Sequence, residues 1–197
     1  ILYNESKLDK HSNKKIILVE GYFDVIKLNQ FGFSNCVAPL GTSINHDRII
    51  ELTKKGYEII VCLDGDLAGR NASLRLMNNL LSSKDFELGV KFVLLPKNYD
   101  PDLMLESQMK DQLIKLINQP LKIEQFIDKY LDKYFSSNDI DEQFKGSKAL
   151  KGILSSIENL DLKKILNQYF QNKSFSSKTR PKKQNTLISN AEFGNDL

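Results

Sequence analysis

Residues 59–70 read Ile-Ile-Val-Cys-Leu-Asp-Gly-Asp-Leu-Ala-Gly-Arg, an apolar run that ends in two carboxylates separated by one glycine. The run is short, apolar and rich in β-branched residues, which is typical of a buried strand. Gly65 allows a sharp turn after the strand and leaves Asp64 and Asp66 free to face one ion. Asp-Gly-Asp is also a common turn sequence, so this stretch alone leaves both interpretations open.

The same arrangement occurs at two other places in the chain. Residues 16–19 and 92–95 are apolar runs of strand type, and acidic residues follow each of them. The six acidic residues are Glu20, Asp24, Asp64, Asp66, Asp100 and Asp102. In an open α/β sheet, ligands bind outside the carboxyl ends of the strands, where these side chains would meet. Clustered carboxylates repel one another unless a cation neutralises them, and oxygen ligands favour Mg²⁺ or Mn²⁺.

Each acidic pair also has a purely structural interpretation. Asp24 could be the N-cap of a helix, and Asp100 and Asp102 could belong to a turn and an N-cap, with Pro101 as the first helical residue. Taken singly, each motif is weak. Their conjunction at three separate strand ends favours a metal site for phosphoryl chemistry.

Two further features point to phosphate binding. The loop Leu40-Gly-Thr-Ser43 could hold a phosphate on its backbone amides, so we predict that Gly41 and Thr42 contact a nucleotide or its phosphate. Arg70 lies in the first turn of a predicted helix and could pair with a phosphate. A structural pair between Arg70 and an aspartate is the alternative.

Strands and helices alternate in the first half of the chain. This order predicts an α/β fold with a parallel sheet flanked by helices. The predicted strands are 16–19, 36–38, 59–63 and 91–95, and the predicted helices are 24–31, 46–55 and 68–81. Beyond Asp102 only helical spacing remains. The predicted divisions are a lead-in at 1–13, the α/β domain at 14–107, a helical subdomain at 108–172 and a disordered tail or linker at 173–197.

Composition restricts the possible functions. The chain has 197 residues and a net charge of +3. Residues 1–172 hold 23 basic and 23 acidic side chains, so this part is a weak nucleic-acid binder by charge alone. An apolar run of about 18 residues is absent, which argues against a membrane span. The chain begins at Ile1, and we interpret it as a fragment of a longer cytoplasmic protein.

The cysteines and histidines do not form a recognisable site. Cys36 and Cys62 lie in separate apolar stretches, and His11 and His46 are isolated. A zinc motif needs closely paired ligands, so we predict structural or surface roles for all four and no zinc in this fragment.

The motifs together resemble a known family. The series Glu20-Gly-Tyr-Phe-Asp24-Val25, Leu40-Gly-Thr42, Asp64-Gly-Asp-Leu-Ala-Gly-Arg70 and Asp100-Pro-Asp102 is similar, in order and spacing, to the TOPRIM domain of bacterial DnaG-type primases. The similarity extends more weakly to about Asn172. It implies a Rossmann-like TOPRIM sheet followed by a small all-helical subdomain.

The resemblance also implies a reaction and its partners. Glu20, Asp64 and Asp66 would be catalytic, and these three with Asp24, Asp100 and Asp102 would form a site for two or more Mg²⁺ or Mn²⁺ ions. The reaction would be nucleotidyl transfer, joining ribonucleoside triphosphates into a short RNA primer on a single-stranded DNA template. The replicative helicase would bind through a region outside this chain, in the cytoplasm at the replication fork and without a membrane.

Two other classes of function remain open from the sequence. The first is a TOPRIM-type metal-dependent nuclease, which would cleave nucleic acid without incorporating nucleotides. The second is a non-catalytic module that docks a replication protein, which would fail to bind Mg²⁺ or Mn²⁺ at millimolar concentration.

Overall fold

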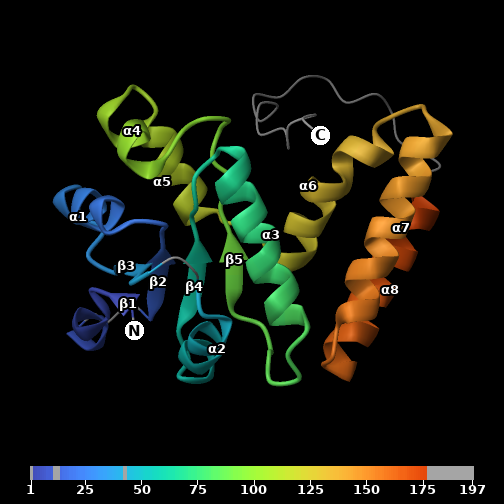
Figure 1. Cartoon of the computed structure of the whole chain (residues 1–197), viewed down its shortest axis with the longest axis horizontal. Helices are drawn as coiled ribbons and strands as arrows, with labels where there is room; N and C mark the ends of the chain where they lie inside the picture. Colours follow the sequence, from blue (N-terminus) through green and yellow to red (C-terminus); the bar gives the residue numbers. More distant parts are fainter. Residues whose placement is uncertain (1, 11–13, 42–43, 177–197) are drawn as a thin grey trace.

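A five-stranded sheet forms the centre of the molecule (Figure 1). The computed structural model describes residues 2–10, 14–41 and 44–176. The strand order is β1-β3-β2-β4-β5. The strands are β1 (Leu2–Tyr3), β2 (Lys15–Leu18), β3 (Cys36–Pro39), β4 (Glu58–Val61) and β5 (Val90–Phe92). Strands β3, β2, β4 and β5 are parallel, whereas β1 is antiparallel to β3.

The two central strands are buried on both faces. Alternate side chains of a strand point to opposite faces, and here both sets are apolar. In β2, Ile16 and Leu18 lie in one core cluster, whereas Ile17 lies in the other. Strand β4 divides in the same way, with Ile59 on the first face and Ile60 on the second. The continuous apolar runs therefore mark the centre of the sheet.

Helices cover the two faces of the sheet unequally. One face packs against α1 (Tyr22–Gln30), α4 (Pro101–Glu106) and α5 (Lys110–Asn118). The other packs against α2 (His46–Lys54), α3 (Leu67–Leu81) and α6 (Ile123–Phe135). Helices α7 (Ile140–Ser156) and α8 (Leu160–Ser176) extend the same core, with α7 in contact with α3, α6 and α8. Figure 1 shows α6, α7 and α8 together on the far side of α3. None of the described helices is long and apolar enough to cross a membrane.

The later helices share a core with the sheet. The Phe92 ring stacks on the Phe126 ring with 4.2 Å between centroids, and Phe92 and Leu121 exchange two backbone hydrogen bonds of 2.8 and 2.7 Å. The Glu158 amide donates to the Leu81 carbonyl at the end of α3, 3.0 Å away. Helices α6–α8 thus extend the core of the α/β part. The division at 107/108 stays a prediction.

Two elements differ from the expectation. Leu2–Tyr3 forms an edge strand inside the predicted lead-in, and a 3₁₀ helix follows it at Glu5–Lys10. Two residues are too few for a periodic pattern, so sequence reasoning missed this strand. Helix α8 continues to Ser176, four residues into the predicted tail. Residues 177–197, the rest of that tail, lie outside the described residues.

Cys36, Cys62 and His46 occupy core or surface positions, as expected for residues with structural or surface roles. Cys36 and Cys62 are buried free thiols in the core. His46 begins α2, with Nε2 3.5 Å from the Asp47 carboxylate. His11 lies outside the described residues.

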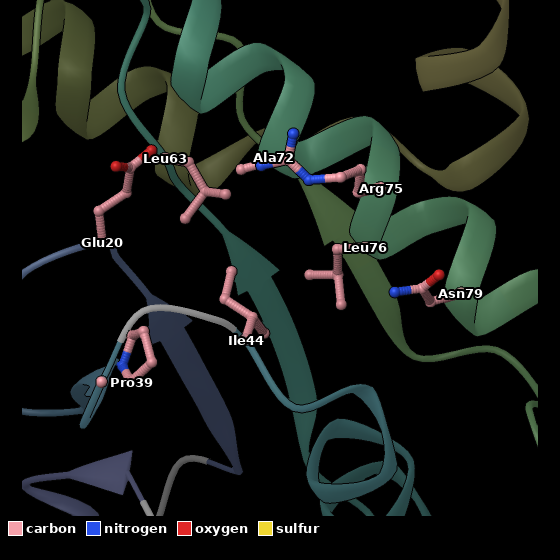
Figure 2. A pocket seen from close by; sticks show the side chains of 9 residues that line it. Glu20, Pro39, Ile44, Leu63, Ala72, Arg75, Leu76 and Asn79 are labelled. Carbon is pink, nitrogen blue, oxygen red and sulfur yellow. The ribbon is translucent and has the colours of Figure 1, made fainter.

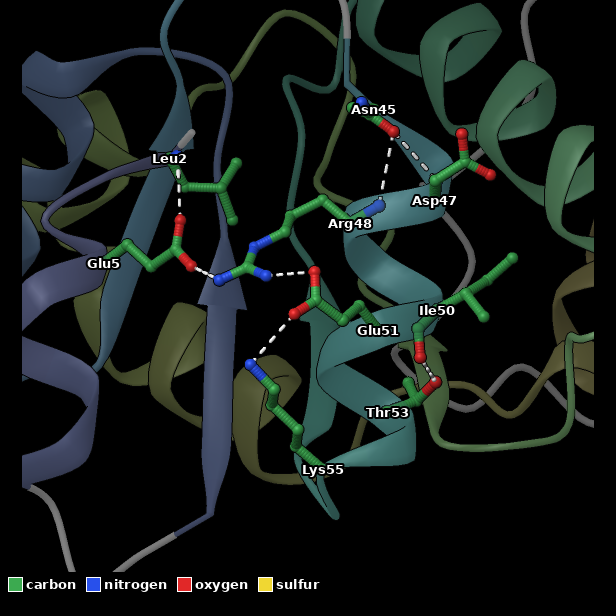
Figure 3. A network of polar contacts seen from close by, with 9 residues as sticks. All are labelled: Leu2, Glu5, Asn45, Asp47, Arg48, Ile50, Glu51, Thr53 and Lys55. Carbon is green, nitrogen blue, oxygen red and sulfur yellow. Dashed lines mark hydrogen bonds and ion pairs between the residues drawn. The ribbon is translucent and has the colours of Figure 1, made fainter.

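A polar network holds the N-terminal edge in place (Figure 3). Arg48 of α2 forms ion pairs with both Glu5 and Glu51, and Lys55 Nζ lies 2.9 Å from Glu51 Oε1. The other Glu5 oxygen accepts a 3.0 Å hydrogen bond from the Leu2 amide. Hydrogen bonds from Arg48 and Lys55 lower the pKa of Glu51 to about 2. One guanidinium therefore joins β1 and the 3₁₀ helix to α2.

We expect Arg48→Ala to loosen this edge without unfolding the protein. The variant should melt about 2 to 4 °C lower, because partly exposed ion pairs contribute little individually. Hydrogen exchange should show faster loss of amide protection at Leu2 and Tyr3 than in β2. Lys7→Ala, at an exposed residue of the same segment, is the control. Equal protection in both variants would contradict this role for Arg48.

Candidate metal centre

The first two acidic residues follow neighbouring strands. Glu20 lies two residues after β2, and Asp64 lies three residues after β4, which pairs with β2 in parallel. The Asp64 amide donates a 3.3 Å hydrogen bond to Glu20 Oε1. The parallel register thus places these two carboxylates side by side at the carboxyl edge of the sheet.

The turn after β4 is packed too tightly for a side chain. A Cβ added at Gly65 would lie 2.0 Å from the Pro96 carbonyl oxygen, and one at Gly69 would lie 2.3 Å from the Asp64 carbonyl oxygen. The Gly65 amide donates to the Tyr99 carbonyl oxygen at 2.8 Å. These contacts bring the segment after β5, which carries Asp100 and Asp102, against the Asp64 turn.

Two carboxylates cap helix starts, and a third lies in the first turn of a helix. Asp66 Oδ1 accepts from the Gly69 amide at 2.8 Å, and Asp100 Oδ1 accepts from the Leu103 amide at 2.6 Å. Both are N-caps, and Pro101 is the first residue of α4, as the structural interpretation predicted for that helix. Asp24 is not the N-cap of α1: that residue is Gly21, whose amide donates to Asp24 Oδ2 at 3.1 Å.

Asp102 already has a cationic neighbour. Lys27 Nζ of α1 lies 3.2 Å from Asp102 Oδ1, and it also pairs with Glu106. Hydrogen bonds to these two carboxylates raise the pKa of Lys27, with the Glu106 bond contributing most. A metal ion at Asp102 would therefore compete with this ammonium group.

The pKa values show that the acidic residues share one electrostatic neighbourhood. Burial and the charges of Glu20, Asp24, Asp100 and Asp66 raise the pKa of Asp64 to about 7. Burial, followed by the charges of Asp100, Asp102 and Glu20, raises the pKa of Asp24 to about 6 against the Gly21 hydrogen bond. Burial also raises the pKa of Glu20, with the Asp64 amide and Arg75 opposing the shift.

Asp64 differs from the other members of this set. Its Oδ1 atom is buried and has no hydrogen-bond partner in the described part of the chain. Asp102 Oδ1 is also buried without a hydrogen-bond partner, but it lies 3.2 Å from Lys27 Nζ in an ion pair. A buried carboxylate oxygen without a partner is costly, and a bound cation would remove that cost. All the donors are carboxylate oxygens, which suit a hard divalent ion. The residues therefore fit Mg²⁺ or Mn²⁺ chemically.

The six acidic side chains do not converge on a single point. Within residues 2–10, 14–41 and 44–176, no three acidic, histidine or cysteine side chains converge closely enough to hold an ion. Asp24, Asp66 and Asp100 each accept a backbone hydrogen bond instead. Binding an ion would require some of these side chains to change rotamer.

The described residues predicted to contact phosphate differ in their exposure to solvent. Gly41 is exposed with φ of +124°, and Thr42 lies outside the described residues. Arg70 is only 5% exposed, and its Nε donates a 3.0 Å hydrogen bond to the Gly65 carbonyl oxygen. In this structure Arg70 positions the Asp64–Asp66 turn.

A cavity of about 440 Å³ lies beside Glu20 (Figure 2). Its lining includes Glu20, Gly41, Ile44, Arg75, Leu76 and Asn79, and we call it the α3 cavity. Sequence reasoning missed Arg75 and Asn79. The signal was available in their spacing, because residues four apart in a helix share one face.

The raised pKa values predict how the metal-free protein responds to pH. The pKa of Asp64 is about 7 in the folded protein, whereas an aspartate in the unfolded chain has a pKa of about 3.9. The folded state therefore binds the proton more tightly, and this contribution to stability is complete below about pH 3.9 and is lost as the pH rises to about 7. We expect the melting temperature in a chelator to fall by about 5 °C more in the wild type than in Asp64→Asn between pH 4.5 and 8. Parallel curves for the two proteins would contradict this assignment.

Comparison with known proteins identifies the fold. Residues 14–91 match the Toprim domain family. Over 194 residues the chain is 39% identical to the DNA primase of Rickettsia conorii, covering 96% of this chain. It superimposes on a DNA primase domain from Pseudomonas aeruginosa with a TM-score of 0.70 and 28% identity over 87% of the chain. These matches support a fragment of a bacterial DnaG-type primase.

The DnaG-type relatives are longer than this chain. It spans 32% of the Rickettsia conorii primase and 54% of the Pseudomonas aeruginosa domain. A further neighbour is a DnaG primase catalytic domain bound to single-stranded DNA, with a TM-score of 0.66, 28% identity and coverage of 87% of this chain and 56% of that one. The chain therefore corresponds to a portion of the primase catalytic core.

Proposed function

We propose that this chain carries the metal-binding catalytic centre of a DNA primase, which joins ribonucleotides into short RNA primers on a DNA template. The observation that carries the proposal is the half-buried Asp64 carboxylate, whose buried Oδ1 atom lacks a hydrogen-bond partner among the described residues and which is surrounded by other acidic groups. The similarity to primases supports nucleotidyl transfer as the reaction, and the carboxylates at the carboxyl edge of the sheet support a divalent-metal site.

The proposed ligands are the six carboxylates at the strand ends. Glu20 and Asp64 lie on neighbouring strands, and Asp66, Asp100 and Asp102 lie on the turns beside them. Asp24 is the acidic neighbour on α1. These residues would hold the divalent ions, which would supply charge stabilisation for the attacking 3′-hydroxyl and the leaving pyrophosphate.

The chain's own residues would prepare that site. Gly65 and Gly69 allow the two turns to approach, and Arg70 fixes the Gly65 carbonyl. The raised pKa of Asp64 means that this group exchanges its proton for a metal ion near neutral pH. Metal binding should therefore release protons and strengthen as pH rises from 6 to 8.

The proposed partners are a single-stranded DNA template and ribonucleoside triphosphates. The solved DnaG catalytic domain with single-stranded DNA supports the template. Residues 1–172 carry balanced charge, so we expect template affinity to come mainly from other parts of a complete primase.

The function is tested by giving a complete primase that contains this sequence both possible substrates. The protein is incubated with Mg²⁺, ribonucleoside triphosphates and a labelled single-stranded DNA template. We expect short RNA products and an intact template, and no products when a chelator replaces Mg²⁺. Cleavage of the template without ribonucleotide incorporation would favour a TOPRIM-type nuclease and overturn the proposal.

A further inference from the structure

Lys27 joins the helix that carries Asp24 to the helix that carries Asp102. It follows Asp24 by three residues, so the two side chains share one face of α1. Its Nζ atom lies 3.2 Å from Asp102 Oδ1 and also contacts Glu106 Oε1, one turn farther along α4. The Lys27 side chain is 21% exposed, so this ammonium group lies between the two helices.

The two carboxylates differ in how much they depend on that ammonium group. Asp102 Oδ1 is buried, and Lys27 Nζ is its cationic neighbour. The negative charge of Asp102 also reaches the acidic residues at the strand ends, where it helps to raise the pKa of Asp24. The Glu106 side chain is 60% exposed, so water can solvate it. Lys27 therefore neutralises a proposed metal ligand in the metal-free protein.

A divalent ion and Lys27 would compete for the Asp102 carboxylate. The two cations repel each other at such short range, so the ammonium group has to withdraw when an ion binds. Glu106 offers it a second carboxylate that it already contacts, so Lys27 can leave Asp102 without becoming unpaired. Partly exposed ion pairs contribute little individually, which keeps the cost of this exchange small.

We propose that Lys27 takes the place of a divalent ion at Asp102 in the metal-free protein, and that metal binding moves its ammonium group onto Glu106 alone. This inference rests on the proposed function and deepens it, because it names a residue that sets the affinity of the centre at Asp102. Lys27 is a positioning residue, which keeps the Asp102 carboxylate neutralised until an ion replaces it. The competing account is a permanent clamp between α1 and α4 that stays closed when metal binds.

Calorimetric titration of this chain with Mn²⁺ at pH 8 separates the two accounts. We expect Lys27→Met to bind Mn²⁺ about fivefold more tightly than the wild type, because the ion no longer displaces an ammonium group. The same variant should melt about 2 °C lower in a chelator, because α1 and α4 lose an ion pair. A permanent clamp predicts losses in both measurements. Lys115→Met, at an exposed lysine of α5, is the matched control and should bind Mn²⁺ as the wild type does.

The movement of Lys27 is visible in the nitrogen-15 NMR signal of its ammonium group during titration with Mg²⁺, which is diamagnetic. We expect this signal to shift, and its protons to exchange faster with water, because one of the two carboxylate partners is lost. In Asp102→Asn the Lys27 signal should respond much less. Saturation of the wild type with Mg²⁺ without a change at Lys27 would overturn the inference.

The titrations distinguish failure of this inference from failure of the proposed function. If the wild type binds Mn²⁺ and Lys27→Met binds it equally or more weakly, the inference is overturned and the metal centre stands. An equal gain in Lys115→Met would also overturn it, because the effect would then reflect net charge alone. Binding by Lys27→Met alone would support the inference while contradicting metal binding by the native chain. If none of the proteins binds Mn²⁺, the proposed metal centre fails and this inference fails with it.

Discussion

Primer synthesis should fall by about a thousandfold or more when Asp64 is replaced by alanine in a complete primase containing this sequence. A thousandfold loss corresponds to about 4 kcal/mol of transition-state stabilisation, which is reasonable for a ligand that positions a catalytic metal ion. Asp64 is selected because its buried Oδ1 lacks a partner in the described part of the chain. The measurement is the yield of RNA primers on single-stranded DNA at saturating Mg²⁺.

The fold should survive this substitution. Asp64→Ala removes a carboxylate whose burial and acidic neighbours already disfavour its charge, so the metal-free variant should be at least as stable as the wild type at pH 8. Asp111→Ala removes an exposed carboxylate from α5 and is the charge-matched control. A normal primer yield from Asp64→Ala would remove Asp64 from the catalytic centre.

Gly65→Ala should strongly destabilise the fold. The added Cβ would lie 2.0 Å from the Pro96 carbonyl oxygen and 3.0 Å from the Tyr99 carbonyl oxygen, so backbone must move. Overpacking of this kind costs about 3 kcal/mol when the surroundings cannot give. The 2.8 Å hydrogen bond from Gly65 to Tyr99 would be strained as well. Denaturant unfolding with a fluorescence or circular dichroism readout gives the free energy of unfolding.

Gly152→Ala is the matched control for Gly65→Ala. Gly152 lies inside α7, and a Cβ there would meet nothing within 4 Å. Alanine is the better helix former by about 1 kcal/mol, so this variant should be as stable as the wild type or more stable. If the two alanine variants unfolded at the same denaturant concentration, the close approach of the two turns would not matter for stability.

Much of the fold was predictable because the signals were strong and local. The runs at 16–19 and 59–63 are apolar at every position, as befits strands buried on both faces, and Asn45 caps α2 where a helix was expected to begin. Strand β1 was missed because its two residues are held by contacts distant in sequence. Asn4 Nδ2 donates to the Cys36 carbonyl, 32 residues away, and Glu5 pairs with Arg48.

The candidate site was only partly predictable. The strand-end rule correctly indicated that Glu20 and Asp64 would be neighbours, because both follow parallel strands that pair. The cap before Pro101 was one of the alternatives that the sequence offered. The sequence could not reveal that Asp66 caps a helix, that Asp102 pairs with Lys27, or that Arg70 is turned inward. Those details depend on side-chain packing between turns. The roles of the six carboxylates in metal binding stay a prediction.

The metal centre itself is tested most directly by titrating this chain with Mn²⁺ in a calorimeter at pH 8. The same titration is made on Asp64→Ala/Asp66→Ala and on Asp111→Ala/Asp161→Ala, whose two carboxylates are exposed and far from the strand ends in sequence. We predict binding to the wild type and to the second variant, and loss of binding in the first. Equal binding by all three proteins, or none by the wild type, would contradict a divalent-metal centre at the carboxyl edge of this sheet.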